Sequence, residues 1–107
     1  MILVTTPEVP GRRTDDVLGL VRGNTIRGRH VGHDFQAMLR NMTGGEIKEY
    51  TKMMAETREQ AIDRMVDEAR ALGADAIVAL RFSTCEVMKG AAEMLCYGTA
   101  VTLHPAE

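Results

Sequence analysis

The hydrophobic positions between residues 43 and 73 recur every three or four residues. This spacing places them along one side of an α-helix with 3.6 residues per turn. They are Ile47, Tyr50, Met53, Met54, Ala61, Ile62, Met65, Val66, Ala69 and Leu72. Charged residues on the opposite side are spaced for weak ion pairs: Lys52 with Glu56, Arg64 with Glu68, and Asp67 with Arg70. The pattern predicts one long amphipathic helix.

Both ends of this helix carry recognisable signals. Thr43 followed by Glu46 has the form of a capping box, and Gly73 suits the left-handed residue that follows a helix. About 27 residues at about 1.5 Å each give a helix of roughly 40 Å. A compact chain of this size has a radius of gyration of about 13 Å and a diameter near 34 Å. Either the helix ends project, or another subunit covers part of the apolar stripe.

Four stretches have the composition or alternation of β-strands, and one more has helical spacing. The strands are expected at residues 2–6, 17–29, 74–84 and 94–103, and a short helix at residues 33–41. Gly19 and Gly23 lie inside the second strand, where glycine allows a bulge or the close approach of another backbone. A turn at Gly23 that splits the stretch into a hairpin is the alternative.

The strand at residues 74–84 has two distinct faces. The alternation predicts that one face meets the long helix; its members are Ala76, Val78, Leu80 and Phe82. Arg81 belongs to the other face, where it points to solvent or to a subunit interface and can pair with a carboxylate.

The composition fits one globular α+β domain over residues 1–107, with 45% hydrophobic and 26% charged residues. The core is poor in bulky side chains, because the chain has two Phe, two Tyr and no Trp beside eight Met. Met at helical spacing is typical of core packing, with an adaptable ligand surface as the alternative. A thin core in a small domain favours burial through oligomerisation.

The net charge of −2 and the absence of a Lys/Arg run argue against nucleic acid or an acidic membrane as partner. Residues 1–11 lack the basic region and long apolar core of a signal peptide or membrane anchor. We therefore expect a cytoplasmic protein. Its two cysteines are then expected to be free thiols, because the cytoplasm is reducing.

Candidate ligands for a transition-metal ion are scattered along the chain. They are His30, His33, His104, Cys85, Cys96, Asp34 and Glu86. His30 and His33 supply two donors if the segment is turned, and Cys85 and Cys96 can face each other across a hairpin if the register allows. The alternative is that the cysteines are small buried residues and the imidazoles lie on the surface.

The sequence contains no motif that orders its residues into catalytic roles, such as a nucleophile elbow or HExxH. Thr5, Thr6 and Glu8 lie beside prolines, a possible place for a ligand contact. We favour the simpler interpretation that they hydrogen-bond the turn.

Several segments in this order resemble the YbjQ-like family of small bacterial and archaeal proteins: VTTPEVPGRR, LGLVRGNTIRGRHVGHD, GGEIKEYTKMMAETREQAIDRM and ARALGADAIVALRFSTCEVMKGAAEMLCYGTAV. The resemblance covers residues 2–103. It implies a dodecin-like β-α-β-β subunit with extra short strands, in which one long helix packs on a mostly antiparallel sheet. It also implies a ring-shaped homopentamer. The family has no established activity, and its label refers to heavy-metal binding.

Eight polar residues match the family signature and are candidates for a ligand site, a subunit interface or a central channel: Thr5, Thr6, Glu8, Arg22, Asn24, Arg81, Ser83 and Glu86. They can equally serve to hold the ring together. The leading hypothesis is a non-enzymatic cytoplasmic homo-oligomer that binds a small ligand or metal ion at subunit boundaries. The alternatives are an enzyme whose site is assembled between subunits and a purely structural interaction module.

Overall fold

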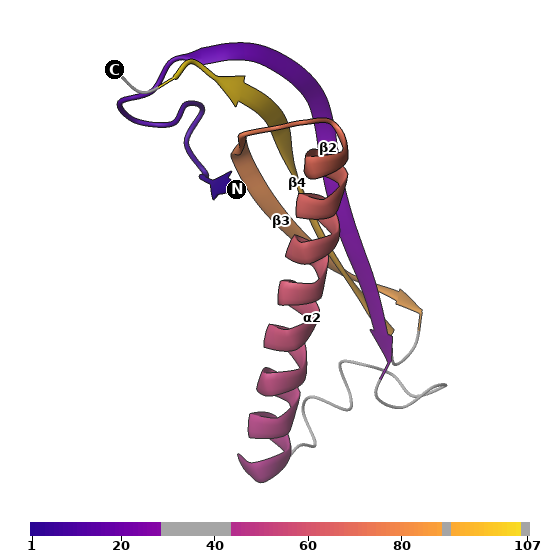
Figure 1. The fold of residues 1–107 in the computed structure, drawn as a ribbon. Helices are drawn as coiled ribbons and strands as arrows, with labels where there is room; N and C mark the ends of the chain where they lie inside the picture. The colour runs from indigo at the N-terminus through magenta and orange to yellow at the C-terminus, as the bar shows by residue number, and fades with distance from the viewer. Residues whose placement is uncertain (29–43, 89–90, 106–107) are drawn as a thin grey trace.

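The computed structural model describes residues 1–28, 44–88 and 91–105. In chain order, its elements are β1 (Ile2–Leu3), β2 (Thr14–Gly28), α2 (Gly44–Ala71), β3 (Ala76–Met88) and β4 (Ala91–Leu103). One long helix lies against a twisted sheet (Figure 1). The long helix is therefore confirmed, whereas the short helix expected at residues 33–41 and the capping residue Thr43 lie outside the described residues.

The four strands form one sheet in the order β1-β3-β4-β2. β2 and β3 are both antiparallel to β4, and β1 is parallel to β3. The α+β class and the mostly antiparallel sheet are thus as predicted. The first strand spans only Ile2–Leu3, which is shorter than expected, and β2, β3 and β4 are each longer than expected. β2 runs without a break through Gly23 and Asn24, which excludes the alternative of a hairpin there.

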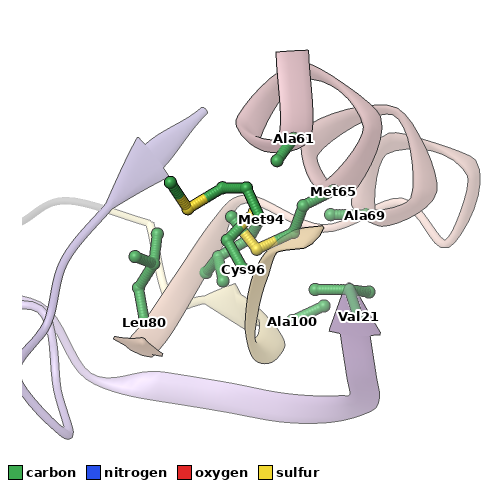
Figure 2. Close-up of a cluster of buried hydrophobic side chains, with 9 residues drawn as sticks. Val21, Ala61, Met65, Ala69, Leu80, Met94, Cys96 and Ala100 are labelled. Atoms are coloured by element: carbon green, nitrogen blue, oxygen red, sulfur yellow. The ribbon is translucent and has the colours of Figure 1, made fainter. Parts of the chain in front are cut away.

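The apolar stripe of α2 packs mainly on β2, less on β4 and very little on β3. Ala61, Met65 and Ala69 are fully buried and contact a cluster that includes Val21 and Cys96 (Figure 2). The largest fully buried side chains of the described residues are Met65, Ile77, Val21, Val101, Thr57 and Cys96, none of them aromatic. The core is built from small and flexible side chains, as the composition predicts.

The C-terminus of α2 has the hydrogen bonds of a Schellman motif. Gly73 has φ of +81°, its N–H donates to the Arg70 carbonyl at 3.0 Å, and the Ala74 N–H donates to the Ala69 carbonyl at 3.1 Å. The helix end predicted from Gly73 is confirmed. Leu72 was expected on the buried stripe but is 47% exposed, because it follows the last helical residue and no longer points to the sheet.

Glycine determines how closely α2 approaches β2. A Cβ atom on Gly23 would collide with the backbone of Ala61 and Met65, so the helix rests directly on the strand there. Beside this contact, the Arg64 guanidinium donates to the Asn24 carbonyl at 2.6 Å instead of forming the surface pair expected with Glu68. The expected pair of Asp67 and Arg70 does form, at 3.8 Å.

The helix-facing side of β3 changes at a bulge. The register shifts between Val78 and Arg81, and Ala79 between them has φ of 54°. Ile77 and Leu80 therefore belong to the cluster under the helix, whereas Val78 lies in a second cluster on the opposite face. The predicted alternation is wrong at Ala76 and Val78, because an extra residue reverses the faces.

Phe82 was also predicted to meet the long helix, and it does so only in part. Its pairing with Cys96 places it on the helix side of the sheet. It is nevertheless 44% exposed, because α2 covers β2 and β4 and barely reaches β3.

The residues before β2, which we call the N-terminal segment, form backbone hydrogen bonds with this bulge at the edge of the sheet. The Ala79 N–H donates to the Thr6 carbonyl at 2.8 Å, and the Leu80 N–H donates to the Val4 carbonyl at 3.1 Å. Val9 of the same segment packs on the second cluster, with Val78 and Leu103. The segment thus closes the upper end of the face that the helix does not cover.

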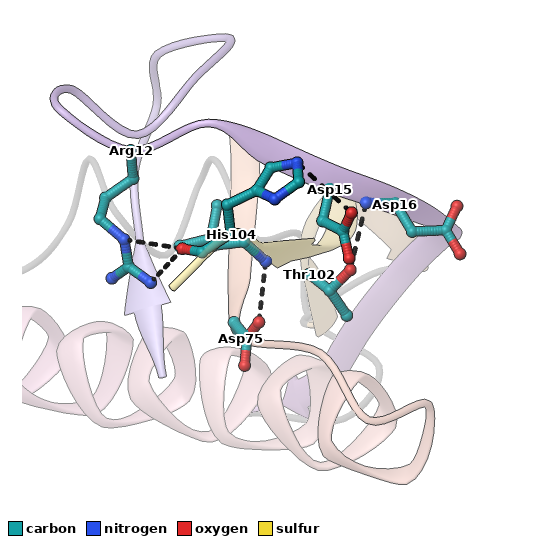
Figure 3. Close-up of polar contacts among 7 residues, drawn as sticks. Arg12, Asp15, Asp16, Asp75, Thr102 and His104 are labelled. Atoms are coloured by element: carbon teal, nitrogen blue, oxygen red, sulfur yellow. Dashed lines mark hydrogen bonds and ion pairs between the residues drawn. The ribbon is translucent and has the colours of Figure 1, made fainter. Parts of the chain in front are cut away.

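A network of polar contacts lies at the same end of the sheet, where β2 and β3 begin and β4 finishes (Figure 3). Arg12 donates to the His104 carbonyl at 2.9 Å, and His104 Nε2 lies 3.4 Å from Asp15 Oδ1. Asp75, between α2 and β3, accepts a hydrogen bond from the Leu103 N–H at 2.8 Å. These contacts tie the start of β2, the start of β3 and the end of β4 together.

The molecule is elongated. Its radius of gyration is 17.0 Å and its extents are 55 × 23 × 17 Å, against about 13 Å for the radius of gyration of a compact chain of this length. The first turns of α2 continue past the ends of the strands (Figure 1). The helix length led us to expect either projecting ends or coverage by another subunit, and the single chain shows a projecting N-terminal end.

The contact at Gly23 can be tested by substitution. Gly23→Ala should lower the free energy of unfolding by about 3 kcal/mol, because the added methyl group pushes the helix away from β2. Gly73→Ala is the control: it has open space and only the cost of a positive φ, about 1 kcal/mol. Urea unfolding at matched protein concentration measures both, and equal losses would contradict the close contact.

Candidate functional site

The face of the sheet opposite α2 carries most of the polar residues singled out in the sequence. The strand register arranges its side chains in four rows across β2, β4 and β3. The rows are Leu20, Thr99 and Val78; Arg22, Tyr97 and Arg81; Asn24, Leu95 and Ser83; and Ile26, Glu93 and Cys85. We call these twelve residues the open face.

Large apolar side chains on the open face are in contact with solvent. Leu20 is 63% exposed, Ile26 58% and Tyr97 38%. Among the described residues, the N-terminal segment packs on this side beside Val78 and contacts Arg81 of the second row through the Thr5 carbonyl. Several large exposed apolar side chains on one sheet face, interspersed with polar ones, favour an interaction site there.

The second row places two arginines on either side of Tyr97. Arg81 is oriented by its own backbone surroundings: Nη1 donates to the carbonyls of Thr5 and Leu80, each at 2.8 Å. Arg22 lies on β2, on the other side of Tyr97, and is exposed. Neither arginine forms an ion pair with any described carboxylate. The row therefore offers positive charge beside an aromatic ring.

The third and fourth rows bring together a thiol, a carboxylate and an amide. Cys85 Sγ lies 4.0 Å from Glu93 Oε1, and Asn24 Nδ2 donates to Glu93 Oε2 at 3.3 Å. Cys85 and Asn24 are exposed and Glu93 is half-buried. Three strands thus each contribute one polar group to the same small area.

The two cysteines do not face each other. Cys85 pairs with Glu93 on the open face, whereas Cys96 pairs with Phe82 on the helix side, where it is fully buried. Burial raises the pKa of the Cys96 thiol above its ordinary value. The thiol donates to the Gly23 carbonyl, with 3.6 Å between sulfur and oxygen. One chain therefore cannot use both thiols for one metal ion, which corrects the hypothesis of a shared cysteine site.

The other residues singled out in the sequence lie at different places in the structure. Thr6 Oγ1 donates to the Glu8 carbonyl at 2.6 Å, so its turn-stabilising role is confirmed. Glu86 pairs with Ala92 on the helix side of the sheet, away from the open face. His30 and His33 lie outside the described residues.

Two residues of the open face, Glu93 and Tyr97, were not among the site candidates selected from the sequence. The expected strand at residues 94–103 started one residue too late to include Glu93, and Tyr97 was treated only as an apolar position. Extending the alternation of Leu95 backwards by two residues would have placed Glu93 on the same side. Its neighbours on the adjacent strands, however, depend on the register.

The described residues contain no group of three or more His, Cys, Asp and Glu side chains suited to one metal ion. The pair formed by Cys85 and Glu93 combines a soft sulfur donor with an oxygen donor, which are both ligands of zinc and related ions. This donor set fits part of a heavy-metal site. The described chain by itself does not complete it.

Comparisons with known proteins agree on one family. A family model described as "Putative heavy-metal-binding" matches residues 1–104. A UPF0145 protein of Thermosipho melanesiensis is 51% identical over 107 residues, which cover 100% of this chain and 99% of the relative. A UPF0145 protein of Archaeoglobus fulgidus is 53% identical, covering 97% and 96%. One from Thermus thermophilus is 56% identical, covering 98% and 93%.

A solved structure shows the same fold. It is a protein of unknown function from Pediococcus pentosaceus, placed in the DUF74 family, and it superposes with a TM-score of 0.68. The alignment covers 97% of this chain and 98% of that chain at 17% sequence identity. Separately, α2 is too polar to cross a membrane, and it is the one helix of the described residues.

The placement of the two cysteines predicts their reactivity. Iodoacetamide should label Cys85 in the folded protein, and Cys96 should react at least about 100-fold more slowly, because it is buried. Raising the pH should leave Cys96 slower than Cys85, because burial shields the Cys96 thiol and raises its pKa. Mass spectrometry counts the labels. The Cys85→Ser variant should take up label only on unfolding, and rapid labelling of it while folded would contradict the arrangement.

Proposed function

This chain belongs to the YbjQ-like family, and from that premise we propose that it functions as a cyclic homo-oligomer that binds a small ligand or heavy-metal ion where subunits meet. The subunit contact is made by the open face together with the free edges of the sheet. A dodecin-like ring of five chains is the form that the family resemblance implies.

The observation that supports this proposal most directly is the exposure of Leu20, Ile26 and Tyr97 on one face. Covering a fully exposed Leu or Ile side chain contributes about 1.5–3 kcal/mol. A chain whose described core holds no aromatic side chain gains more from covering this face than a well-filled domain would. The elongated shape, with a radius of gyration of 17.0 Å, points in the same direction.

The edges of the sheet favour a ring over a two-fold dimer. The outer edge of β2 has no described partner strand, and β1 pairs with β3 only at Ala76 and Ile77. These two edges lie at opposite sides of the sheet and their strands point the same way, because both are antiparallel to β4. Joining unlike edges of successive copies is a heterologous contact, which closes into a ring when the rotation allows. Closure also removes exposed strand edges, which otherwise promote aggregation.

In such an assembly, the polar residues of the open face lie beside the boundary. Arg22, Asn24, Arg81 and Ser83 occupy two adjacent rows of this face. Their side chains offer hydrogen-bond donors and positive charge for an anionic ligand, and the next row offers Cys85 and Glu93 for a metal ion. Arg81 also links the boundary to the N-terminal segment through the Thr5 carbonyl.

The assembly is tested by the mass of the purified protein in solution. Static light scattering behind a sizing column should give about five times the 11.8 kDa of one chain, independent of loading at micromolar concentration. A monomer with a cooperative unfolding transition would refute the assembly, and a dimer would refute the ring.

The role of the open face is tested by matched substitutions of exposed leucines. Leu20→Asp should shift the oligomer towards monomer by at least about tenfold, because a charge then replaces an apolar side chain at the contact. Leu72→Asp is the control, since Leu72 is 47% exposed but lies beyond the end of α2 and off the open face. Equal effects of the two substitutions on the mass distribution would exclude the open face as the contact.

A further inference from the structure

We propose that α2 of one copy covers the bare half of β3 of the next copy. This inference deepens the proposed function by naming the segment that each subunit contributes to its neighbour, and it rests on that proposal for the ring itself. The covered surface lies on the helix side of the sheet, where Phe82, Thr84 and Glu86 are all exposed. It is therefore separate from the open face.

The second half of β3 has little cover from the described part of its own chain. Phe82 is 44% exposed, although its partner Cys96 on β4 is fully buried beneath α2. The same contrast holds in the row of Thr84, which is exposed beside the buried Met94. The N-terminal segment makes backbone hydrogen bonds with β3 only as far as Leu80, so the outer edge beyond this residue has no described strand beside it. Half-covered rows of this kind indicate that another element completes the layer.

The helix is displaced towards the opposite edge of the sheet. It packs mainly on β2, which is an edge strand, and Gly23 lets the helix backbone rest directly on that strand. A helix with its side chains is about 10–12 Å across, whereas neighbouring strands are about 4.7–4.9 Å apart. A helix above an edge strand therefore extends about one strand beyond the sheet. Each chain thus has an overhanging helix at one edge and a bare strand at the other.

Head-to-tail joining of the two edges brings these features together. β2 and β3 point the same way, so β2 of one copy can extend the sheet of the next copy beside the free edge of β3. Head-to-tail repetition keeps every helix on the same side of the joined sheet. The helix that overhangs β2 then lies over β3 of the neighbour, which is the strand that the neighbour's own helix leaves bare.

The outer flank of α2 carries a charge that suits this contact. Ile62 and Val66 pack on the core cluster, and Arg64, two residues from each, is about 200° away around the helix. Arg64 therefore lies on the outward flank, where it donates to the Asn24 carbonyl of β2. The bare half of β3 presents Glu86, which forms no ion pair with a described residue and has the opposite charge. Complementary charges favour this orientation of the two copies.

Photochemical cross-linking from position 82 tests the proposal on the full-length protein. Chains with Phe82→p-benzoylphenylalanine are unfolded and refolded together with an excess of isotope-labelled wild-type chains and then irradiated. Mass spectrometry should find residue 82 joined to α2 of a labelled chain, because the aromatic side chain lies beneath the neighbour's helix. Cross-links that stay within one chain, or that reach another element of the labelled chain, would overturn the proposal.

Matched substitutions of exposed apolar residues give a second measurement. Phe82→Ser should shift the oligomer towards smaller species by at least about tenfold, because the contact with the neighbouring helix loses apolar area. Leu72→Ser is the control, since Leu72 is 47% exposed but follows the last helical residue, and it should keep the wild-type mass distribution. Circular dichroism checks that both variants fold. Equal effects on the mass would exclude Phe82 from the contact.

The same measurements separate this proposal from the proposed function. A ring in which position 82 cross-links to no α2 of another copy removes the helix contact and leaves the ring standing. A dimer in which position 82 cross-links to α2 of the other copy supports the contact and removes the ring. A monomer removes both.

Discussion

The close contact of α2 with β2 determines which side of the sheet becomes core. At Gly23 the helix backbone rests on the strand, and a single methyl group would not fit between them. This contact places Met65 over Val21 and Cys96, and Arg64 against the Asn24 carbonyl. Because the chain has only one helix among its described elements, covering one face this closely leaves the other face without a helix.

The opposite face is only partly closed by the rest of the chain. The N-terminal segment packs Val9 on the second cluster and supports the bulge at Ala79 with backbone hydrogen bonds. This segment lies beside Val78 and Arg81, in the first two rows of the open face. Apolar and polar side chains of the open face alternate in contact with solvent, among them Leu20 and Ile26. The proposed assembly arises from this feature.

The candidate site depends on register more than on composition. Arg22, Asn24, Arg81 and Ser83 were selected from the sequence as separate residues, and the structure brings all four onto one face. Cys85 and Cys96 illustrate the opposite case. Both are plausible ligands in the sequence, but the register pairs Cys85 with Glu93 and Cys96 with Phe82, which puts the two thiols on opposite faces of the β3–β4 hairpin. Glu93, which the sequence did not single out, is the carboxylate that lies beside Cys85.

The sequence by itself determined the elements that depend on local periodicity. The helix, its glycine-marked end and the three long strands could be predicted, because side-chain alternation and helix capping act over a few residues. Only the tertiary structure decided the bulge at Ala79, the exposure of Leu72 and Phe82, and the meeting of Cys85 with Glu93. Each of these depends on which strands pair, in which register, and how far one helix reaches across the sheet. Those properties arise from contacts between residues far apart in the chain, and local patterns do not encode them.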